Sequence, residues 1–227
     1  MTIPFKSELS DTAGNFPEKI TKLFINGHWV YSQASNTFKR ANPLDSELCT
    51  EASAAQVEDA LLAVQVADEA RDDWRHVGPS ERRRLLNLAA DELVGRTDQF
   101  TKAMQRETGA STFWVQRNVM HAAAIVKEAA ALTTRVGGTV IPSDVPGNLS
   151  FAIRQPAGVV LGMAPWNAPV ALGARAIATP LACGNTVVLK GSEFCPETHA
   201  LIVEAFQAAG FPPGVINFIV HDKQDAA

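Results

Sequence analysis

Several residue types and patterns are scarce in this sequence of 227 residues, and each absence excludes a class of protein. There are only three cysteines and no Cys-x-x-Cys pair, so a disulfide framework is not predicted. The five histidines show no metal-ligand spacing, and we expect no resident metal. The net charge of −4 gives no electrostatic reason to expect nucleic acid or anionic lipid as a partner.

A membrane-spanning run of apolar residues is also missing. The stretch from Gln155 to Ala174 carries no charge, but three prolines and an asparagine interrupt it, so we interpret it as buried core rather than a membrane span. The first residues lack the apolar segment of a signal peptide. Together with the few cysteines, this predicts a cytoplasmic protein.

The composition that remains is that of a globular protein, with 46% hydrophobic and 19% charged residues. Residues 1–22 are polar and aperiodic and are predicted to form a flexible arm. Residues 23–136 are predicted as a mainly helical region that opens with a hairpin at Asn26-Gly27. Four helical patterns follow, at 57–74, at 79–93, from Thr97 as N-cap to Gly109, and at 112–134.

Residues 137–156 change to a hairpin pattern. Gly137-Gly138 breaks the last helix, and the turn-forming segment 144–148 lies between two short apolar runs. We predict a protruding β-hairpin here.

The last segment, 157–227, alternates between buried strands and helices. The predicted order is a strand at 159–161, a helix at 169–183, a strand at 186–190, a helix at 196–209 and a strand at 215–220. A β-α-β-α-β order with short connections predicts an α/β fold, half of a doubly wound, Rossmann-like parallel sheet. The last strand is expected to leave an unpaired sheet edge, and hence poor solubility or dependence on a partner.

Ligands of such sheets bind beyond the carboxyl ends of the strands. Lys190 and Glu193 follow the second strand, where a lysine can donate to ribose hydroxyls and a glutamate can accept from them. Because a glutamate repels a 2′-phosphate, NAD is favoured over NADP. The alternative is a surface ion pair, and the usual Gly-x-Gly-x-x-Gly fingerprint is absent.

Asn167 follows the first strand, directly before a helix that begins with proline. Its side-chain amide can donate to an oxyanion that develops during a reaction. The alternative is an asparagine that bonds only the backbone of its own turn.

Five segments, in this order and spacing, resemble the NAD(P)-dependent aldehyde dehydrogenase superfamily. They are Pro156-Ala-Gly-Val-Val160, Ala164-Pro-Trp-Asn167, residues 180–190, Ser192-Glu193 and residues 209–217. Phe24-Ile-Asn-Gly27 and Asn42-Pro43 extend the resemblance over nearly the whole chain after residue 22. It implies a cofactor domain, a catalytic domain and a bridging β arm, here 137–156, that joins subunits into a homo-oligomer.

The resemblance also implies roles for single residues. Asn167 is similar to the oxyanion-hole amide, and Lys190 and Glu193, with Ser192 between them, are similar to the ligands of the adenosine ribose. The residues expected to line the nicotinamide side are Met163, Ala164, Pro165 and Trp166. Gly191 departs from the proline common in this loop, which is expected to loosen the backbone near Ser192.

The substrate pocket resembles that of the salicylaldehyde dehydrogenase branch. Ala168 and Ala171 would leave room for a broad, flat substrate, Trp114 would stack on its ring, and Arg175 would bond a hydroxyl group. The hypothesis is therefore an aromatic, hydroxylated aldehyde. The alternative is that Arg175 is a structural ion-pair residue.

The resemblance also implies a nucleophilic cysteine and a glutamate base, which lie further along in the family and are expected beyond Ala227. Cys183 and Cys195 do not match the nucleophile motif, and packing is their expected role. Two classes stay open. The first is an aldehyde dehydrogenase, acting through a cysteine thiohemiacetal, of which this chain is the N-terminal part without the catalytic domain. The second is a truncated, non-catalytic NAD-binding or interaction protein. The chain alone is expected to be inactive.

Overall fold

The structure is a computed structural model, and it describes residues 20–223. Its strands are β1 (Ile20–Thr21), β2 (Leu23–Ile25), β3 (His28–Val30), β4 (Thr37–Ala41), β5 (Leu48–Ser53), β6 (Thr139–Ile141), β7 (Ser150–Ala152), β8 (Val159–Met163), β9 (Thr186–Lys190) and β10 (Ile216–Ile219). Its helices are α1 (Val57–His76), α2 (Pro79–Gly95), α3 (Thr97–Thr108), α4 (Thr112–Leu132), α5 (Pro169–Ala182) and α6 (Pro196–Ala208). The predicted mixed α/β class is confirmed.

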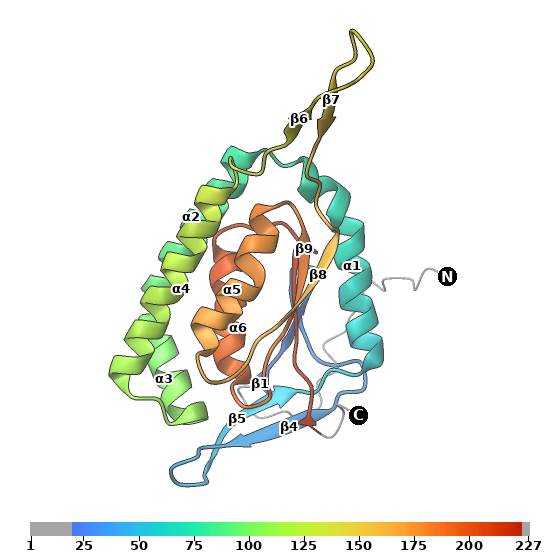
Figure 1. Cartoon of the computed structure of the whole chain (residues 1–227). Coiled ribbons are helices and arrows are strands. Elements are labelled where there is room, and N and C mark those ends of the chain that lie inside the picture. Colours follow the sequence, from blue (N-terminus) through green and yellow to red (C-terminus); the bar gives the residue numbers. More distant parts are fainter. Residues whose placement is uncertain (1–19, 224–227) are drawn as a thin grey trace.

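The core is a five-stranded sheet in the order β3-β2-β10-β9-β8. Strands β8, β9 and β10 are parallel to one another, while β2 and β3 form an antiparallel hairpin. Helix α1 covers one face of the sheet, and α5 and α6 cover the other, with α2 and α4 outside them (Figure 1). The hairpin turn predicted at Asn26-Gly27 is confirmed, because both residues have positive φ, at 51° and 83°.

The open edge of the sheet is not where the sequence predicts it. Strand β10 is covered by β2, with Phe218 opposite Phe24, so the expectation of an unpaired last strand is wrong. The edges of the sheet are β3 and β8, and in β8 Leu161 is 58% exposed although the apolar run 159–161 predicts burial. Among the parallel strands, the first one, β8, therefore has the open edge.

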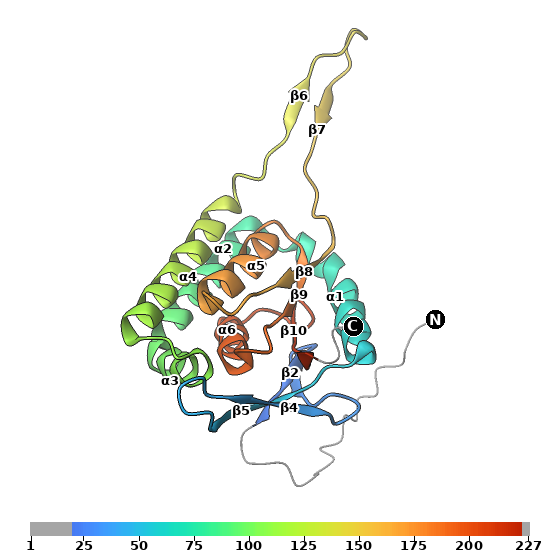
Figure 2. The same cartoon turned by 60° about the horizontal axis from the view of Figure 1, so that its bottom comes forward.

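Three strands near the start of the chain are not predicted from the sequence. Ile20–Thr21, within the predicted flexible arm, pairs in parallel with β5. Strand β5 pairs with β4 in the antiparallel sense (Figure 2). The rest of that arm, residues 1–19, lies outside the described residues. Charged residues interrupt the apolar alternation of β4 and β5, which explains why their pattern is weak.

Two helices differ in detail from the prediction. In α1, the apolar spacing that predicts the helix is only partly buried: Val57, Leu61 and Val64 face solvent, whereas Ala67 and Trp74 are buried. Thr97 does not cap α3: Arg96 is the N-cap, and Thr97 is the first helical residue, with a hydroxyl that donates to the Val94 carbonyl at 2.6 Å. The predicted end of α3 at Gly109 is confirmed by its left-handed backbone, with a φ of 69°.

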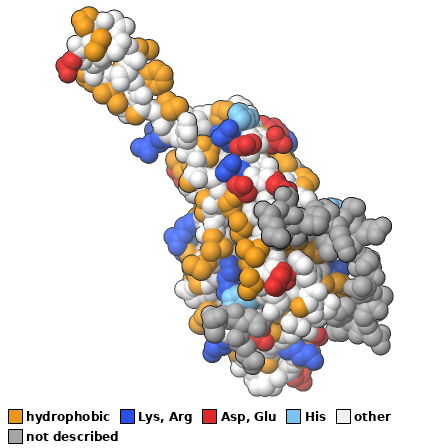
Figure 3. Space-filling model, turned by 90° about the vertical axis from the view of Figure 1, so that its right-hand side faces the viewer, with side chains coloured by type: hydrophobic (Ala, Val, Ile, Leu, Met, Phe, Trp, Pro, Cys, Tyr) orange, Lys and Arg blue, Asp and Glu red, His pale blue; other side chains and the backbone are white. Residues whose placement is uncertain are grey.

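The strands β6 and β7 form a two-stranded antiparallel ladder that projects far from the body (Figures 1 and 2). Hydrophobic side chains are exposed along this arm, as the space-filling view shows (Figure 3). They include Val140, Leu149, Phe151 and Ile153. Between residues 20 and 223, no helix combines the length and the apolar character that crossing a membrane requires.

Candidate functional site

The candidate site lies at the carboxyl edge of the parallel strands. Lys190, the last residue of β9, is in register with Met163 of β8 on one side and with Ile219 of β10 on the other. The N–H of Ala164 donates to the Lys190 carbonyl at 3.0 Å. The segments that follow β8 and β9 therefore begin side by side, although 26 residues separate Ala164 from Lys190 in the sequence.

Lys190 and Glu193 form an ion pair in the segment after β9. The Lys190 Nζ lies 3.8 Å from Glu193 Oε2, and each side chain is only 22% exposed. Ser192 is buried, its hydroxyl lies 3.4 Å from the same carboxylate oxygen, and it accepts the N–H of Phe194 at 3.2 Å. The ion pair named as the alternative is thus formed, within a half-buried loop.

Gly191 is closely packed, and the expected loosening of the backbone is wrong. Its N–H donates to the Ile219 carbonyl at 2.9 Å. A Cβ at this position would lie 2.7 Å from a ring carbon of Phe218. Proline would lose the hydrogen bond and collide with the ring, so glycine suits this loop because its neighbours fill the space.

The residues after β8 differ in exposure. Ala164 is buried, whereas Met163, Pro165, Trp166 and Asn167 are exposed. The ring of Trp166 contacts that of Phe194, with centroids 6.1 Å apart, and so connects the two segments. The backbone carbonyl of Asn167 accepts the indole N–H of Trp114 at 3.3 Å, which brings the predicted oxyanion residue and the predicted ring-stacking residue together.

A groove of about 680 Å³ lies between α4 and the start of α5. Of the four predicted pocket residues, Trp114, Ala168 and Ala171 line it. Its other lining residues are Phe113, Gln116, Arg117, Asn118, Met120 and His121, none of which the sequence analysis selected. Arg175 is exposed farther along α5 and is not part of this lining.

Asn118 is a second residue that links the groove to α5. Its side-chain oxygen accepts the N–H of Ala171 at 3.1 Å, and Ala171 is in the first turn of that helix. The N-cap residue, Ala168, offers no side-chain acceptor of its own, so α4 supplies the cap. The signal in the sequence for this role of Asn118 is its place, as a polar residue, on the apolar helix face that Val115 and Val119 define.

The start of α6 is held by Glu107 from α3. The buried carboxylate accepts the N–H groups of Glu197 and Thr198, both at 2.9 Å, and the Thr198 hydroxyl at 2.7 Å. Burial raises the pKa of Glu107 to about 7. Arg40 donates to the backbone carbonyls of Glu107 and Phe194, each at 3.1 Å from its Nε. These partners are distant in sequence, so periodicity could not find them.

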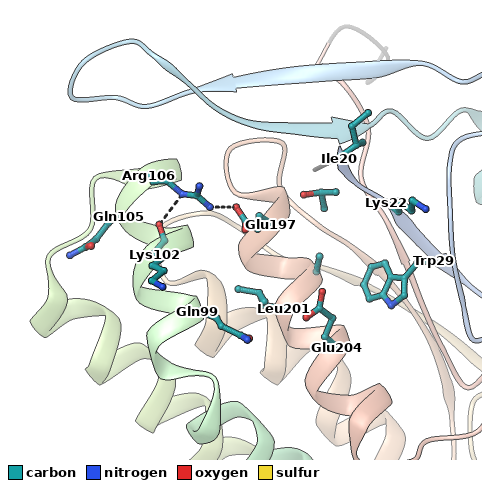
Figure 4. A pocket seen from close by; sticks show the side chains of 12 residues that line it. Ile20, Lys22, Trp29, Gln99, Lys102, Gln105, Arg106, Glu197, Leu201 and Glu204 are labelled. Atoms are coloured by element: carbon teal, nitrogen blue, oxygen red, sulfur yellow. Dashed lines mark hydrogen bonds and ion pairs between the residues drawn. The ribbon is translucent and has the colours of Figure 1, made fainter. Parts of the chain in front are cut away.

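A second hollow, of about 790 Å³, lies between α3, α6 and the strands β1 and β3 (Figure 4). An ion pair between Arg106 and Glu197, at 2.7 Å, crosses it, and Lys22, Lys102 and Glu204 add further charges. None of the predicted site residues lines it. The two segments at the carboxyl edge therefore remain the candidate site.

The chain is similar to known proteins over most of its length. A salicylaldehyde dehydrogenase of Pseudomonas sp. (strain C18) is 50% identical over 199 residues, covering 88% of this chain and 41% of that protein. A vanillin dehydrogenase of Pseudomonas sp. (strain HR199 / DSM 7063) is 51% identical over 204 residues, covering 90% and 42%. The chain thus spans about two fifths of the length of these relatives.

Solved structures agree. A salicylaldehyde dehydrogenase from Pseudomonas putida G7, complexed with salicylaldehyde, matches with a TM-score of 0.90 and 48% identity, over 91% of this chain and 43% of its own. PnpE in complex with nicotinamide adenine dinucleotide matches with a TM-score of 0.87 and 33% identity, over 91% and 42%. The family model described as "Aldehyde dehydrogenase family" matches residues 29–227. The chain therefore belongs to the aldehyde dehydrogenase family.

Proposed function

We propose that this chain is the NAD-binding part of an aldehyde dehydrogenase that oxidises aromatic aldehydes to carboxylic acids. The supporting observation is that two segments lie side by side at the carboxyl edge of the parallel strands. The half-buried pair Lys190–Glu193 follows β9, and Asn167, bonded to Trp114, follows the neighbouring β8. A cofactor site and a substrate groove therefore adjoin.

The residues after β9 fit the ribose of NAD. The ammonium group of Lys190 can donate to a ribose hydroxyl, and the carboxylate of Glu193 can accept from one. The half-buried loop lowers the competition from water for both groups. The negative charge of Glu193 favours NAD over NADP, because a 2′-phosphate would be repelled. When bound, NAD accepts hydride from the substrate.

The residues after β8 fit the reacting end of the site. Met163, Ala164, Pro165 and Trp166 would border the nicotinamide, and the Asn167 amide would donate to the aldehyde oxygen as negative charge develops on it. The cysteine thiolate that attacks the aldehyde and the glutamate that activates water are expected beyond Ala227, in the part that the longer relatives possess. Asn167 would then act with a nucleophile supplied by that part.

The groove between α4 and α5 supports the aromatic substrate class. Trp114 gives it an aromatic wall, and Ala168 and Ala171 leave the space that larger side chains would fill. Relatives named for salicylaldehyde and for vanillin point to the same class. A bond between Arg175 and a substrate hydroxyl stays a prediction, since Arg175 does not line this groove.

The same proposal covers the organisation of the molecule. Residues 23–136 and 157–227 would form the cofactor domain, and the arm 137–156 would pair subunits of a homo-oligomer in the cytoplasm. The exposed apolar residues of the arm, such as Val140 and Phe151, support such pairing because apolar surface of this kind is stabilised by burial.

Cofactor binding is tested by calorimetric titration of the chain with NAD and with NADP. We expect NAD to bind more tightly, the variant Glu193→Gln to lose that preference, and the control Glu47→Gln, at an exposed position, to keep it. Absence of NAD binding would refute the cofactor assignment.

The reaction is tested on the product of the whole reading frame, by NADH absorbance with a panel of aromatic and aliphatic aldehydes. We expect turnover to be fastest with aromatic aldehydes, and Trp114→Ala to reduce that preference. NAD binding without turnover would favour the non-catalytic alternative.

A further inference from the structure

His199 is a buried histidine that no step proposed so far uses. It lies in α6 with no exposed surface, and its Nδ1 accepts the N–H of Ser192 at 3.0 Å. A ring nitrogen that accepts a hydrogen bond carries no proton, so the ring is in the Nε2–H form. Burial, with a contribution from Lys190, lowers the pKa of His199 to about 3 and keeps the ring neutral.

Two glycines make the space for this ring. A Cβ on Gly191, in the loop after β9, would lie 3.2 Å from both Cβ and Nδ1 of His199. A Cβ on Gly173, in α5, would lie 3.3 Å from the ring carbon Cδ2. The imidazole therefore fills a slot between the loop and the helix, and a side chain at either glycine would displace it.

The other ring nitrogen faces the second element. Nε2 is buried and makes no regular hydrogen bond within residues 20–223. A Cβ on Gly173 of α5 would lie 3.7 Å from Nε2, so this side of the ring packs against α5. One side chain thus contacts two elements of the candidate site. Its Nδ1 bonds the loop that contains Glu193, and the opposite side of its ring packs against α5, the helix that follows Asn167.

We propose that His199 is a positioning residue: bonded to the Ser192 N–H and packed against α5, it sets the position of Glu193 for the ribose of NAD. This inference rests on the proposed function for its cofactor. Without the acceptor at Nδ1, the buried N–H of Ser192 is left unpaired and the loop must shift to regain a partner. Glu193, the next residue, moves with it.

Two substitutions of His199 distinguish the roles of its two ring nitrogens. In His199→Asn, the amide oxygen occupies the place of Nδ1 and can accept from Ser192, whereas His199→Gln supplies polar atoms near Nε2 only. The control is His28→Asn, at an exposed position in β3. By calorimetry, we expect NAD binding to weaken roughly ten-fold in His199→Gln. We expect it to stay within about three-fold of the unchanged chain in His199→Asn and to be unchanged in the control.

Amide hydrogen exchange at Ser192, measured by NMR without NAD, provides a second readout. Exchange should be faster in His199→Gln and nearly unchanged in His199→Asn. Equal NAD affinity in both variants, or equal loss in both, would overturn the positioning role, because a merely structural histidine gives no rescue by asparagine. If the unchanged chain binds no NAD, the proposed function fails and the cofactor part of this inference fails with it. The exchange data then decide whether His199 holds the loop, and unaltered exchange in His199→Gln refutes that as well.

Discussion

At the scale of single residues, Gly191 shows how a missing side chain can organise a binding loop. The space beside its Cα is taken by the ring of Phe218 and by His199, and its N–H is bonded to β10. The loop is therefore fixed by neighbours from two other elements. Its glycine is needed for close approach rather than for a left-handed backbone.

Replacing Gly191 with alanine should cost about 1–3 kcal/mol in the free energy of unfolding, because the new methyl group overpacks a filled site. The matched control is Gly95→Ala, at the end of α2, where a Cβ meets no atom within 4 Å. There the helix propensity of alanine should leave stability unchanged or raise it by up to ~1 kcal/mol. Urea unfolding measures both, and equal effects at the two sites would contradict the packing argument.

Glu107 should make stability fall as pH rises. Burial raises its pKa to about 7, against a reference value of 4.5. As pH rises, the unfolded chain therefore loses the Glu107 proton at a lower pH than the folded chain does. The stabilising contribution is complete below pH 4.5 and is lost as pH rises through 7, by up to ~3 kcal/mol. Compared with Glu107→Gln, the unchanged chain should lose stability between pH 4.5 and pH 8.

Urea unfolding over this pH range provides the measurement for Glu107. Glu47→Gln, which removes an exposed carboxylate, gives the background for the comparison. If the free energy of unfolding varies with pH in the same way for the chain and for Glu107→Gln, Glu107 has the same pKa in the folded and the unfolded chain, which contradicts the prediction.

At the scale of elements, the helices of the site are held by partners from other helices. Ala168 and Cys195, the N-cap residues of α5 and α6, make no side-chain cap bond. Asn118 from α4 and Glu107 from α3 bind the free N–H groups instead. The helix starts are thereby fixed relative to α3 and α4 as well as to the sheet.

Asn118→Ala should lower stability by about 1–2 kcal/mol, because it removes the cap of α5 and leaves the Ala171 N–H buried without an acceptor. Gln116→Ala, at an exposed position of the same helix, should change stability by less than ~0.5 kcal/mol. Thermal unfolding followed by circular dichroism compares the two. An Asn118→Ala variant as stable as Gln116→Ala would mean that the hydrogen bond contributes little.

How much was predictable depends on whether the signal is local. Proline at positions 169 and 196 and the apolar runs place β9, α5 and α6 almost to the residue. The strands β4 and β5 alternate too weakly to be found. Lys190 and Asn167 could be selected because strand ends and motifs mark them. The contacts of Asn118, Glu107 and His199 reach across the fold, so their roles needed the structure.

At the scale of the whole molecule, two of the exposed apolar regions are suited to contact with another chain. One is the arm, and the other is the sheet edge at β8, where Leu161 and Met163 are exposed. An edge strand presents unpaired N–H and C=O groups, which invite pairing with another chain. The sequence predicts an open edge at β10, whereas in the structure β10 is paired on both sides and β8 has the open edge.

Leu161→Lys should therefore improve the solubility of the chain, because a charge on an edge strand opposes edge-to-edge association. The control Leu88→Lys introduces the same charge on helix α2, at a position that is 40% exposed. Because a helix has no unpaired strand N–H and C=O groups along its side, this variant should improve solubility less. Static light scattering over a concentration series gives the association of each variant. Equal improvement in both would attribute the effect to net charge alone, and persistent association of both would point to the arm 137–156 as the region through which copies meet.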